Sequence, residues 1–327
     1  MHITVCVSTR DRGSSIATTL RSLLASHYDD FDVIIVDQSV SDESGICVRA
    51  IAGGDQRFHY RRSATIGASR ARNVANSQAR GPVIAFTDDD CEVAPDWLYV
   101  IASTFAARQD VSVICGGVRA GPYDPKDGFI PTYQPRQERL VRSPWLKWRE
   151  SGILANMAIR QETLKQVGAF DEILGPGAPL PNCEDGDMMY RVLRMGGAIL
   201  TVPDAVVTHH GFRTFEEGKT MMPATSLGVG AAFMKHLRLG DVAIAPTLLI
   251  EWMRCIHWGR LLTLRRHNGV RRFFAYARGM GVSFHYPIDR ATRVYREPSA
   301  DGTATRAVFL KQREILAHVI SFIVTSH

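Results

Sequence analysis

Residues 82–91 read PVIAFTDDDC, a short apolar run followed at once by three aspartates. The run from Pro82 to Thr87 has the length and composition of a buried strand in a parallel sheet. We therefore expect Asp88 to Asp90 to lie at one edge of that sheet. Two carboxylates about 4 Å apart repel each other by roughly 4 kcal/mol at an effective dielectric constant near 20, so a cation would stabilise the cluster. Oxygen ligands suit Mg²⁺ or Mn²⁺, and a solvated acidic turn is the alternative interpretation.

The composition indicates a folded intracellular protein. With 327 residues, 45% of them hydrophobic, the chain can form one large domain or a domain with a substantial extension. Its six cysteines include no CxxC pair, which predicts reduced, mostly buried thiols in the cytoplasm. The N-terminal MHITVCVSTRDR lacks a signal-peptide pattern, and no apolar stretch approaches the length of about 18 residues that spans a bilayer. We therefore expect a cytoplasmic protein that is soluble or bound peripherally to the inner membrane face.

Positive charge is concentrated near the C-terminus. The net charge is +6, yet the segment from Trp252 to Arg296 holds ten arginines and one acid, Asp289. Aromatic residues are interleaved with these arginines, a pattern that suits anionic lipid headgroups, a lipid-linked phosphate or nucleic acid, with a solvated helical face as the alternative. The arginines are 254, 260, 265, 266, 271, 272, 278, 290, 293 and 296, and the aromatics are Trp252, Trp258, Phe273, Phe274, Tyr276 and Phe284.

Strand and helix signals alternate through the first part of the chain. Such repeats predict a mostly parallel sheet with helices on both faces. Ligands of these sheets bind at the carboxyl ends of the strands, so we expect Ser8 to Asp11, Asp37 to Ser39 and Asp88 to Asp90 to surround one crevice. The expected strands are 3–8, 32–37, 58–61, 82–87 and 111–118, and the expected helices are 14–26, 41–52, 67–78 and 95–107.

The following region is less regular. Residues 121–144 are rich in proline, glycine and charge, which predicts a long loop. One helix is expected at 161–167 and another after residue 183, ended by glycines. Glu184, Asp185 and Asp187 would lie in the first turn of that second helix, where carboxylates complement the helix dipole even without a catalytic role. Because GxGxxG and P-loop patterns are absent, an anionic nucleotide would need a metal ion and arginines.

Eight short motifs follow one another over residues 1–215: VCVSTRDR, VDQSVSD, IGASRARNVAN, AFTDDDC, ANMAIR, VGAFDE, CEDGDMMYR and VVTHH. In this order and spacing the chain resembles glycosyltransferase family 2, whose members are inverting sugar transferases of the GT-A fold. The resemblance implies an α/β catalytic domain over 1–215, with a Rossmann-like, mostly parallel sheet flanked by helices. It leaves 216–327 as a mainly helical extension. It also implies a nucleotide-diphosphate sugar as the donor and a divalent metal, Mn²⁺ or Mg²⁺, as the cofactor.

The same resemblance implies roles for single residues. Asp185 would be the general base that takes the proton of the acceptor hydroxyl, and Glu184 would help to orient the substrate. Asp187 would only cap its helix. Contacts to the nucleotide sugar are implied for Ser8, Thr9, Arg10, Asp37, Gln38, Arg72, Asp88, Asp89 and Asn156, with Arg72 near the diphosphate. Metal contacts are implied for Asp90 first, then Asp88, His209 and His210.

Several of these assignments stay open. Where many family members have two consecutive acids, this chain has Asp37 followed by Gln38, and an amide can donate as well as accept, so UDP, dTDP and GDP sugars are all candidate donors. A neutral imidazole can complete an oxygen-rich metal shell. His209 is slightly preferred to His210, with an ordinary surface pair as the alternative. Asn156 either lies near a sugar or is a buried amide that binds backbone groups.

The extension and the acceptor are predicted only in outline. Residues 211–230, rich in small side chains, are expected to form a mobile loop that closes over the substrates. The basic helices are expected to dock on an anionic membrane surface where lipid-linked acceptors are presented. A glycan or a small molecule is also open as acceptor.

Two other classes of protein compete with this interpretation. A nucleotide-sugar pyrophosphorylase would share the sheet and the metal-binding acids, but it should have a glycine-rich N-terminal loop that Ser8 to Arg12 lacks. A non-catalytic lipid-binding or nucleic-acid-binding protein would use the arginine-rich region. Because that reading leaves Asp88 to Asp90 and Asp185 without a role, no nucleic-acid partner is expected.

Overall fold

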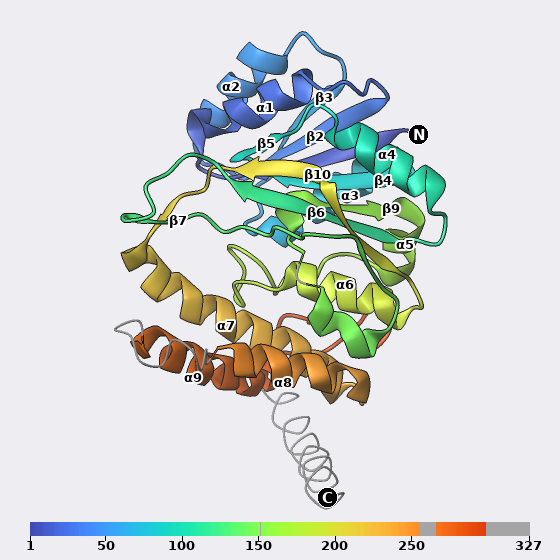
Figure 1. Ribbon diagram of the computed structural model, residues 1–327. Coiled ribbons are helices and arrows are strands. Elements are labelled where there is room, and N and C mark those ends of the chain that lie inside the picture. Colours follow the sequence, from blue (N-terminus) through green and yellow to red (C-terminus); the bar gives the residue numbers. More distant parts are fainter. Residues whose placement is uncertain (151, 256–265, 299–327) are drawn as a thin grey trace, which may run out of the picture.

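The computed structural model contains one large mixed sheet (Figure 1). It describes residues 1–150, 152–255 and 266–298. The strands are β1 (Ile3–Thr9), β2 (Phe31–Asp37), β3 (Phe58–Arg62), β4 (Val83–Asp88), β5 (Cys91–Val93), β6 (Val113–Ala120), β7 (Gly128–Phe129), β8 (Arg139–Val141), β9 (Met157–Arg160), β10 (Ile199–His209) and β11 (Arg213–Thr214). The sheet order is β3-β2-β1-β4-β9-β6-β10-β5, with β8 also paired to β10.

Six of the nine strands in this sheet run in the same direction: β1, β2, β3, β4, β6 and β10. β1 lies between β2 and β4, β3 flanks β2, and β6 pairs with β10, all in parallel. The other three run in the opposite direction: β9, at the centre, is antiparallel to both β4 and β6, and β5 and β8 are antiparallel to β10. All five predicted strands are present, because each is a run of buried apolar residues or, for β3, a half-buried edge. β9 is only four residues long, too short for its pairing to be predicted from periodicity.

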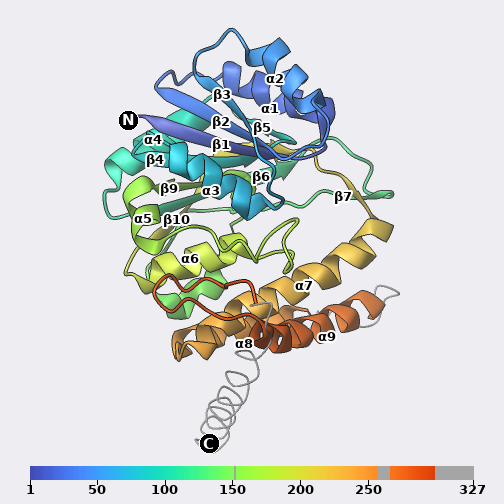
Figure 2. The same ribbon diagram turned by 180° about the vertical axis from the view of Figure 1, so that it is seen from behind.

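Helices cover both faces of the sheet. They are α1 (Ile16–Leu24), α2 (Glu43–Ala52), α3 (Ala68–Gln78), α4 (Trp97–Ala107), α5 (Gln161–Val167) and α6 (Glu184–Arg194). Side chains of α1, α2 and α4 share one apolar core with the sheet, and those of α3, α5 and α6 share the other. Figure 2, from behind, shows α3, α5 and α6 on the second face. The predicted helices and the mostly parallel α/β fold are therefore confirmed.

The long loop predicted at 121–144 is largely irregular in the structure. It contains two short strands: β7, which pairs with β11, and β8, which pairs with β10. A turn of 3₁₀-helix, η2 (Pro144–Arg149), follows it. The other 3₁₀ turns are η1 (Gly13–Ser15), η3 (Leu154–Asn156), η4 (Val242–Ile244) and η6 (Ser283–His285).

The mobile loop predicted at 211–230 is wrong, because most of this segment is the start of α7 (Phe215–Arg238). Thr214 and Glu217 form a capping box that begins the helix. The small residues serve packing instead of mobility: a Cβ on Gly230 would collide with the carbonyl of Tyr276 in the neighbouring helix α9 (Arg266–Val282). Glycine therefore lets the two helices approach closely.

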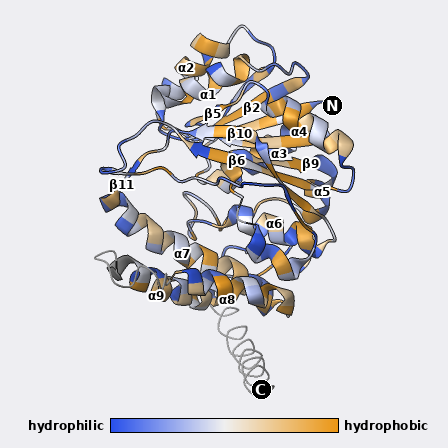
Figure 3. Cartoon of the chain, viewed as in Figure 1, coloured by the Kyte–Doolittle hydropathy of each residue, from blue (hydrophilic) through white to orange (hydrophobic). Residues whose placement is uncertain are grey.

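Helices α7, α8 (Ala245–Arg254) and α9 form a layer beneath α6 (Figure 1). Trp252 stacks on Phe273 with ring centroids 4.7 Å apart, and Tyr276 and Phe284 are buried, so these four aromatics pack between elements. Phe274 is exposed. Figure 3 shows hydrophilic and hydrophobic residues mixed along α7 and α9, in contrast to the hydrophobic strands.

Not every part of the basic segment can be placed. Arg260, Arg265 and Trp258 lie outside the described residues, and the side chain of Arg266 is not described either. Within the described part, Arg254, Arg271, Arg278 and Arg290 are exposed. No helix there has the length and apolar character needed to cross a bilayer. All six cysteines are free thiols, as predicted.

Candidate active site

The three consecutive aspartates lie where β1 and β4 end side by side. Ser8 pairs with Asp88 in the parallel register of these strands, and β5 begins directly after Asp90. Thr19 of α1 stabilises the end of the turn, because its hydroxyl donates a hydrogen bond to the carbonyl of Cys91 at 2.6 Å. The turn is thus held by the sheet and by a helix, at the strand ends where ligands of such folds bind.

Asp89 and Asp90 are both buried but differ in their partners. Thr9 Oγ1 donates to Asp89 Oδ2 at 2.6 Å, yet burial still raises the pKa of Asp89 to about 6. Burial alone would also raise the pKa of Asp90, but His209, 3.2 Å away, and Arg12 bring it below the ordinary value. Asp90 therefore carries the more stable negative charge of the two.

Arg72 of α3 links this turn to the acids of α6. Its guanidinium donates through Nη1 to Glu184 Oε1 at 2.9 Å and through Nη2 to Asp88 Oδ1 at 3.3 Å. The arginine is itself buried, with a side chain only 7% exposed. One cation thereby brings together carboxylates that are 96 positions apart in the sequence, Asp88 and Glu184.

Glu184 and Asp185 form the first turn of α6, as predicted. Cys183, just before them, has a φ of +72°, an uncommon value for a residue other than glycine. Desolvation and the neighbouring Asp185 raise the pKa of Glu184 to about 7, and desolvation also raises the pKa of Asp185. Asp185 is partly exposed whereas Glu184 is buried, so Asp185 is the more accessible carboxylate of this pair.

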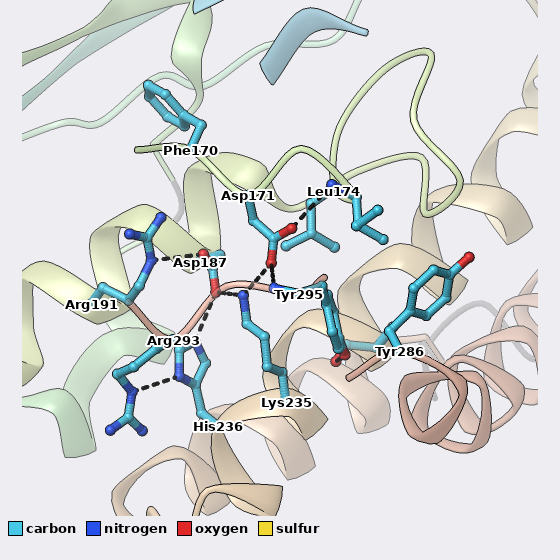
Figure 4. Close-up of polar contacts among 12 residues, drawn as sticks. Phe170, Asp171, Leu174, Asp187, Arg191, Lys235, His236, Tyr286, Arg293 and Tyr295 are labelled. Carbon is cyan, nitrogen blue, oxygen red and sulfur yellow. Dashed lines mark hydrogen bonds and ion pairs between the residues drawn. The ribbon is translucent and has the colours of Figure 1, made fainter. Parts of the chain in front are cut away.

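Asp187 does more than the capping role expected for it. Its carboxylate lies 2.7 Å from Lys235 Nζ, 2.8 Å from His236 Nε2 and 2.9 Å from Arg191 Nε, and Asp187, Lys235 and His236 are wholly buried (Figure 4). Lys235 also contacts Asp171, which accepts a hydrogen bond from the backbone N–H of Tyr295. This network fastens α6 to α7 and to the segment after α9, which Figure 2 shows passing over both helices.

The residues expected at the nucleoside end are heavily hydrogen-bonded within the protein. Asp37 is fully buried and accepts from Ser39 N at 2.8 Å and Tyr60 Oη at 2.6 Å. Gln38 accepts from the N–H of Gly67 and donates to its carbonyl. The Gln38 amide therefore holds the loop before α3 and is already satisfied. Ser8 is half-buried at the end of β1, and Arg10 is exposed and paired with Asp11.

Asn156 lies apart from this group. Its Nδ2 donates to the carbonyls of Gly117 and Ala205, both at 2.8 Å, and its Oδ1 accepts from Trp97 Nε1 at 2.8 Å. With 1% of its surface exposed, the side chain is the buried amide that was the alternative interpretation. Its hydrogen bonds join β6, β10 and α4, which is a structural role.

Comparison with known proteins identifies the family. The sequence profile described as "Glycosyl transferase family 2" matches residues 4–168, about half of the chain. This chain belongs to glycosyl transferase family 2. Of similar proteins, the glucosyl-dolichyl phosphate glucuronosyltransferase of Haloferax volcanii is 25% identical over 131 residues, which are 40% of this chain and 42% of that protein. The matches span less than half of the length of the curated relatives.

Solved structures show that this member of family 2 has the GT-A fold. TarS of S. aureus, residues 1–349, aligns with a TM-score of 0.57 at 16% identity, covering 86% of this chain and 81% of that one. The mannosyltransferase PcManGT from Pyrobaculum calidifontis, in complex with GDP-Man and Mn²⁺, aligns with a TM-score of 0.56 at 16% identity, covering 86% of each chain. At this identity the likeness concerns the fold alone.

The candidate site also contains a side-chain group that fits a divalent metal. Among the described residues, ligand atoms of Asp88, Asp90, Cys91 and His209 lie within 4.8 Å of one another. Asp90 Oδ2 is buried and has no hydrogen bond within the described part of the chain, so this oxygen is an acceptor without a donor. Two carboxylates and an imidazole suit Mn²⁺ or Mg²⁺. His210 lies outside the group and pairs with Glu92 at 3.3 Å.

Two residues of the candidate site had no role in the sequence-based prediction. Arg12, which follows β1, contacts Asp90 Oδ2 through Nη2 at 3.1 Å and lies 3.8 Å from Asp89 Oδ1. Tyr60 of β3 holds Asp37. Arg12 stands within the motif VCVSTRDR, but only the fold brings it to acids almost 80 positions away, so spacing alone carried no signal for the contact.

Proposed function

We propose that this glycosyltransferase moves a hexose from a nucleotide-diphosphate sugar to an acceptor hydroxyl, with inversion at the anomeric carbon and with a divalent metal. The observation that carries the proposal is the double contact of Arg72 with Asp88 and Glu184. It connects the acids suited to the leaving diphosphate with the turn that holds Asp185. Donor and acceptor chemistry can then take place in one crevice, as an in-line displacement requires.

The donor side needs compensation of negative charge. A diphosphate leaves as the glycosidic bond breaks, and a bound Mn²⁺ or Mg²⁺ would neutralise the charge that develops on it. Asp90, Asp88 and His209 would hold this ion, with Asp90 as the principal ligand because its pKa is lowered. Asp89, fixed by Thr9, would set the conformation of the turn and face the donor ribose. Arg72 would assist the diphosphate while keeping Glu184 in place.

The acceptor side needs a base. Asp185 is partly exposed, and its raised pKa makes it a stronger base than an ordinary aspartate. It would accept the hydroxyl proton as the acceptor oxygen attacks from the face opposite the leaving group, and this geometry inverts the anomeric centre. Glu184, held by Arg72, would orient the sugar beside it.

The donor is proposed only as a class of compound, the nucleotide-diphosphate sugars. TarS in complex with UDP-GlcNAc and PcManGT in complex with GDP-Man support a nucleotide-diphosphate sugar. Ser8, Arg10 and Asp37 would line the nucleoside end. Because the Gln38 amide is occupied by Gly67, it would act by shaping that end and not by reading the base. UDP, dTDP and GDP sugars remain the candidates.

The acceptor is proposed to be a glycan, a lipid-linked glycan or a small molecule. A cytoplasmic enzyme that docks on the inner membrane face would meet a lipid-linked acceptor, and the name of the Haloferax volcanii relative supports this option. Arg254, Arg271, Arg278 and Arg290 would provide the docking charge. Changing these four arginines to Gln should reduce binding to liposomes that contain anionic lipid. If the variant and the wild type bind these liposomes equally well, the membrane is removed from the proposal.

A thermal-shift screen tests the proposed function directly. The purified protein is melted with UDP, dTDP, GDP and their sugars, with and without Mn²⁺, beside Asp90→Ala and the exposed control Asp204→Ala. A ligand at 100 times its dissociation constant adds roughly 2.7 kcal/mol, or about 5 °C for a chain of this size. We expect a metal-dependent shift for one nucleotide that is lost in Asp90→Ala only. A cooperative melt without any shift would contradict the proposal.

The role of the base is tested separately once the donor is known. Asp185→Asn should keep the thermal shift from donor and metal but lose transfer to the acceptor by a factor of about 10³ or more. Loss of donor binding together with activity would show that Asp185 belongs to the donor site and not to the acceptor site.

A further inference from the structure

Arg12 differs from Arg72, the other arginine that contacts the turn of Asp88 to Asp90 (the acid turn), because its side chain is more exposed to solvent. Its side chain is 37% exposed, whereas that of Arg72 is 7% exposed. Arg72 contacts two carboxylates at once and cannot leave without stranding buried charge. Arg12, in contrast, can turn into solvent while its own charge stays hydrated.

The backbone that carries Arg12 is fixed. Asp11 and Gly13, on either side, have φ values of +53° and +52°. Asp11 N donates to Ser39 Oγ at 2.7 Å, and Asp11 Oδ1 accepts from Val40 N at 3.1 Å. Gly13 adopts its positive φ without the strain that a side chain would add there. A change in the position of the guanidinium would therefore come from the side chain.

The contact of Arg12 coincides with the open acceptor of the candidate metal group. Its Nη2 lies 3.1 Å from Asp90 Oδ2, the buried oxygen that has no aligned hydrogen bond. The pair is thus an ion contact without hydrogen-bond geometry. The other oxygen of this carboxylate, Oδ1, faces His209 Nε2 at 3.2 Å. A guanidinium and a metal ion cannot both occupy the space in front of Oδ2.

We propose that Arg12 is the resident counter-ion of Asp90 in the metal-free protein and that a divalent cation displaces its guanidinium from this carboxylate. The proposal rests on the metal dependence proposed above. The arginine keeps two adjacent buried carboxylates, Asp89 and Asp90, compensated before metal binds. Metal binding then exchanges one cation for another, so the acid turn has the same conformation in both states. Because the Arg12 contact must be broken, it lowers the net affinity for the metal.

Direct Mn²⁺ binding tests the displacement without any need for a substrate. Mn²⁺ affinity is measured by titration calorimetry and by the electron paramagnetic resonance signal of free Mn²⁺ for the wild type, Arg12→Gln and Arg12→Lys. We expect Arg12→Gln to bind Mn²⁺ about fivefold more tightly, because the competing partly exposed ion pair is gone. Arg12→Lys keeps a competing charge and should lie between the two.

A matched control separates displacement from the general field of a positive charge. Arg213 donates to the carbonyl of Phe212 and acts on Asp90 through its charge. Arg213→Gln removes the same charge without removing a contact with Asp90, so it should raise Mn²⁺ affinity much less than Arg12→Gln. Equal effects of the two variants, or unchanged or weaker Mn²⁺ binding by Arg12→Gln, would overturn the proposal.

A melt in EDTA confirms that each variant is folded and adds a second readout. Arg12→Gln should melt lower than the wild type in EDTA and recover more of its stability on addition of Mn²⁺. If the wild type and Asp90→Ala both fail to bind Mn²⁺, the metal dependence itself is wrong. If the wild type binds and only the response to Arg12 is missing, the displacement alone is wrong.

Discussion

Arg72 donates to Glu184 at 2.9 Å from inside the protein, with both side chains 7% exposed. The pair joins α3 to the first turn of α6, and the second nitrogen of Arg72 reaches Asp88 at the end of β4. A planar guanidinium can serve two carboxylates at once, whereas an ammonium is a point charge. The relative position of the two acid motifs thus depends on one side chain.

Arg72→Lys should accordingly lose function although it conserves charge. We expect the free energy of unfolding to fall by about 2–4 kcal/mol, because one buried carboxylate is left without its partner, and metal-dependent nucleotide binding to weaken. Urea denaturation and thermal shifts measure the two effects. The matched control is Arg70→Lys on the same helix, whose ion pairs with Glu172 and Glu297 are exposed and should contribute within about 0.5 kcal/mol. Equal losses in both variants would argue against a special role of Arg72.

Glu184→Gln should change how stability depends on pH. The pKa of Glu184 is raised to about 7 in the folded protein against an ordinary 4.5, so the folded state binds the extra proton between these values. Protonated Glu184 therefore contributes up to about 3 kcal/mol to the free energy of unfolding of the wild type below pH 4.5. This contribution is lost as the pH rises through 7. Glutamine cannot ionise, so the stability of Glu184→Gln relative to the wild type should increase from pH 5 to pH 8. A constant difference across this range would contradict the raised pKa.

His236 should make the protein sensitive to mild acid. Arg293 Nε can only donate to His236 Nδ1, so the proton of the neutral ring is on Nε2, facing Asp187. Burial lowers the pKa of His236 to about 4 from 6.5. Unfolding therefore takes up a proton between pH 6.5 and 4, and stability should fall by about 3 kcal/mol as pH decreases through this window. Denaturation of His236→Gln should show a smaller slope over this range, while the exposed control His27→Gln should keep the wild-type slope.

Two glycines of the helical layer should respond in opposite directions to alanine. Gly230→Ala places a methyl group against the carbonyl of Tyr276 and should destabilise the protein by about 1–3 kcal/mol. Gly281→Ala in α9 meets open space and should stabilise it by about 0.5–1 kcal/mol through helix propensity. Thermal melts of both variants check the assignment of 215–238 as a packed helix. A Gly230→Ala variant as stable as the wild type would indicate that α7 and α9 do not cross closely.

Local chemistry along the sequence was sufficient to predict the alternating strands and helices, the sheet edge with three aspartates and the first turn of α6. These features depend on neighbours in the chain: an apolar run ended by acids, or carboxylates before a helical stripe. The failures arose where long-range packing decides. The small residues of 211–230 resemble a loop by composition, but in the fold they are the contact surface of α7.

The order of residues along the chain specifies the type of sheet, the family motifs and the side chains available for chemistry. The use of those side chains depends on the packed fold. This fold assigned Asn156 and the Gln38 amide to backbone contacts, placed His209 rather than His210 beside Asp90, and brought Arg12 and Arg72 to their carboxylates. The physical reason is that hydrogen bonds and ion pairs act over a few ångströms in space, and distances of this kind between remote residues exist only once the sheet and its helices have packed.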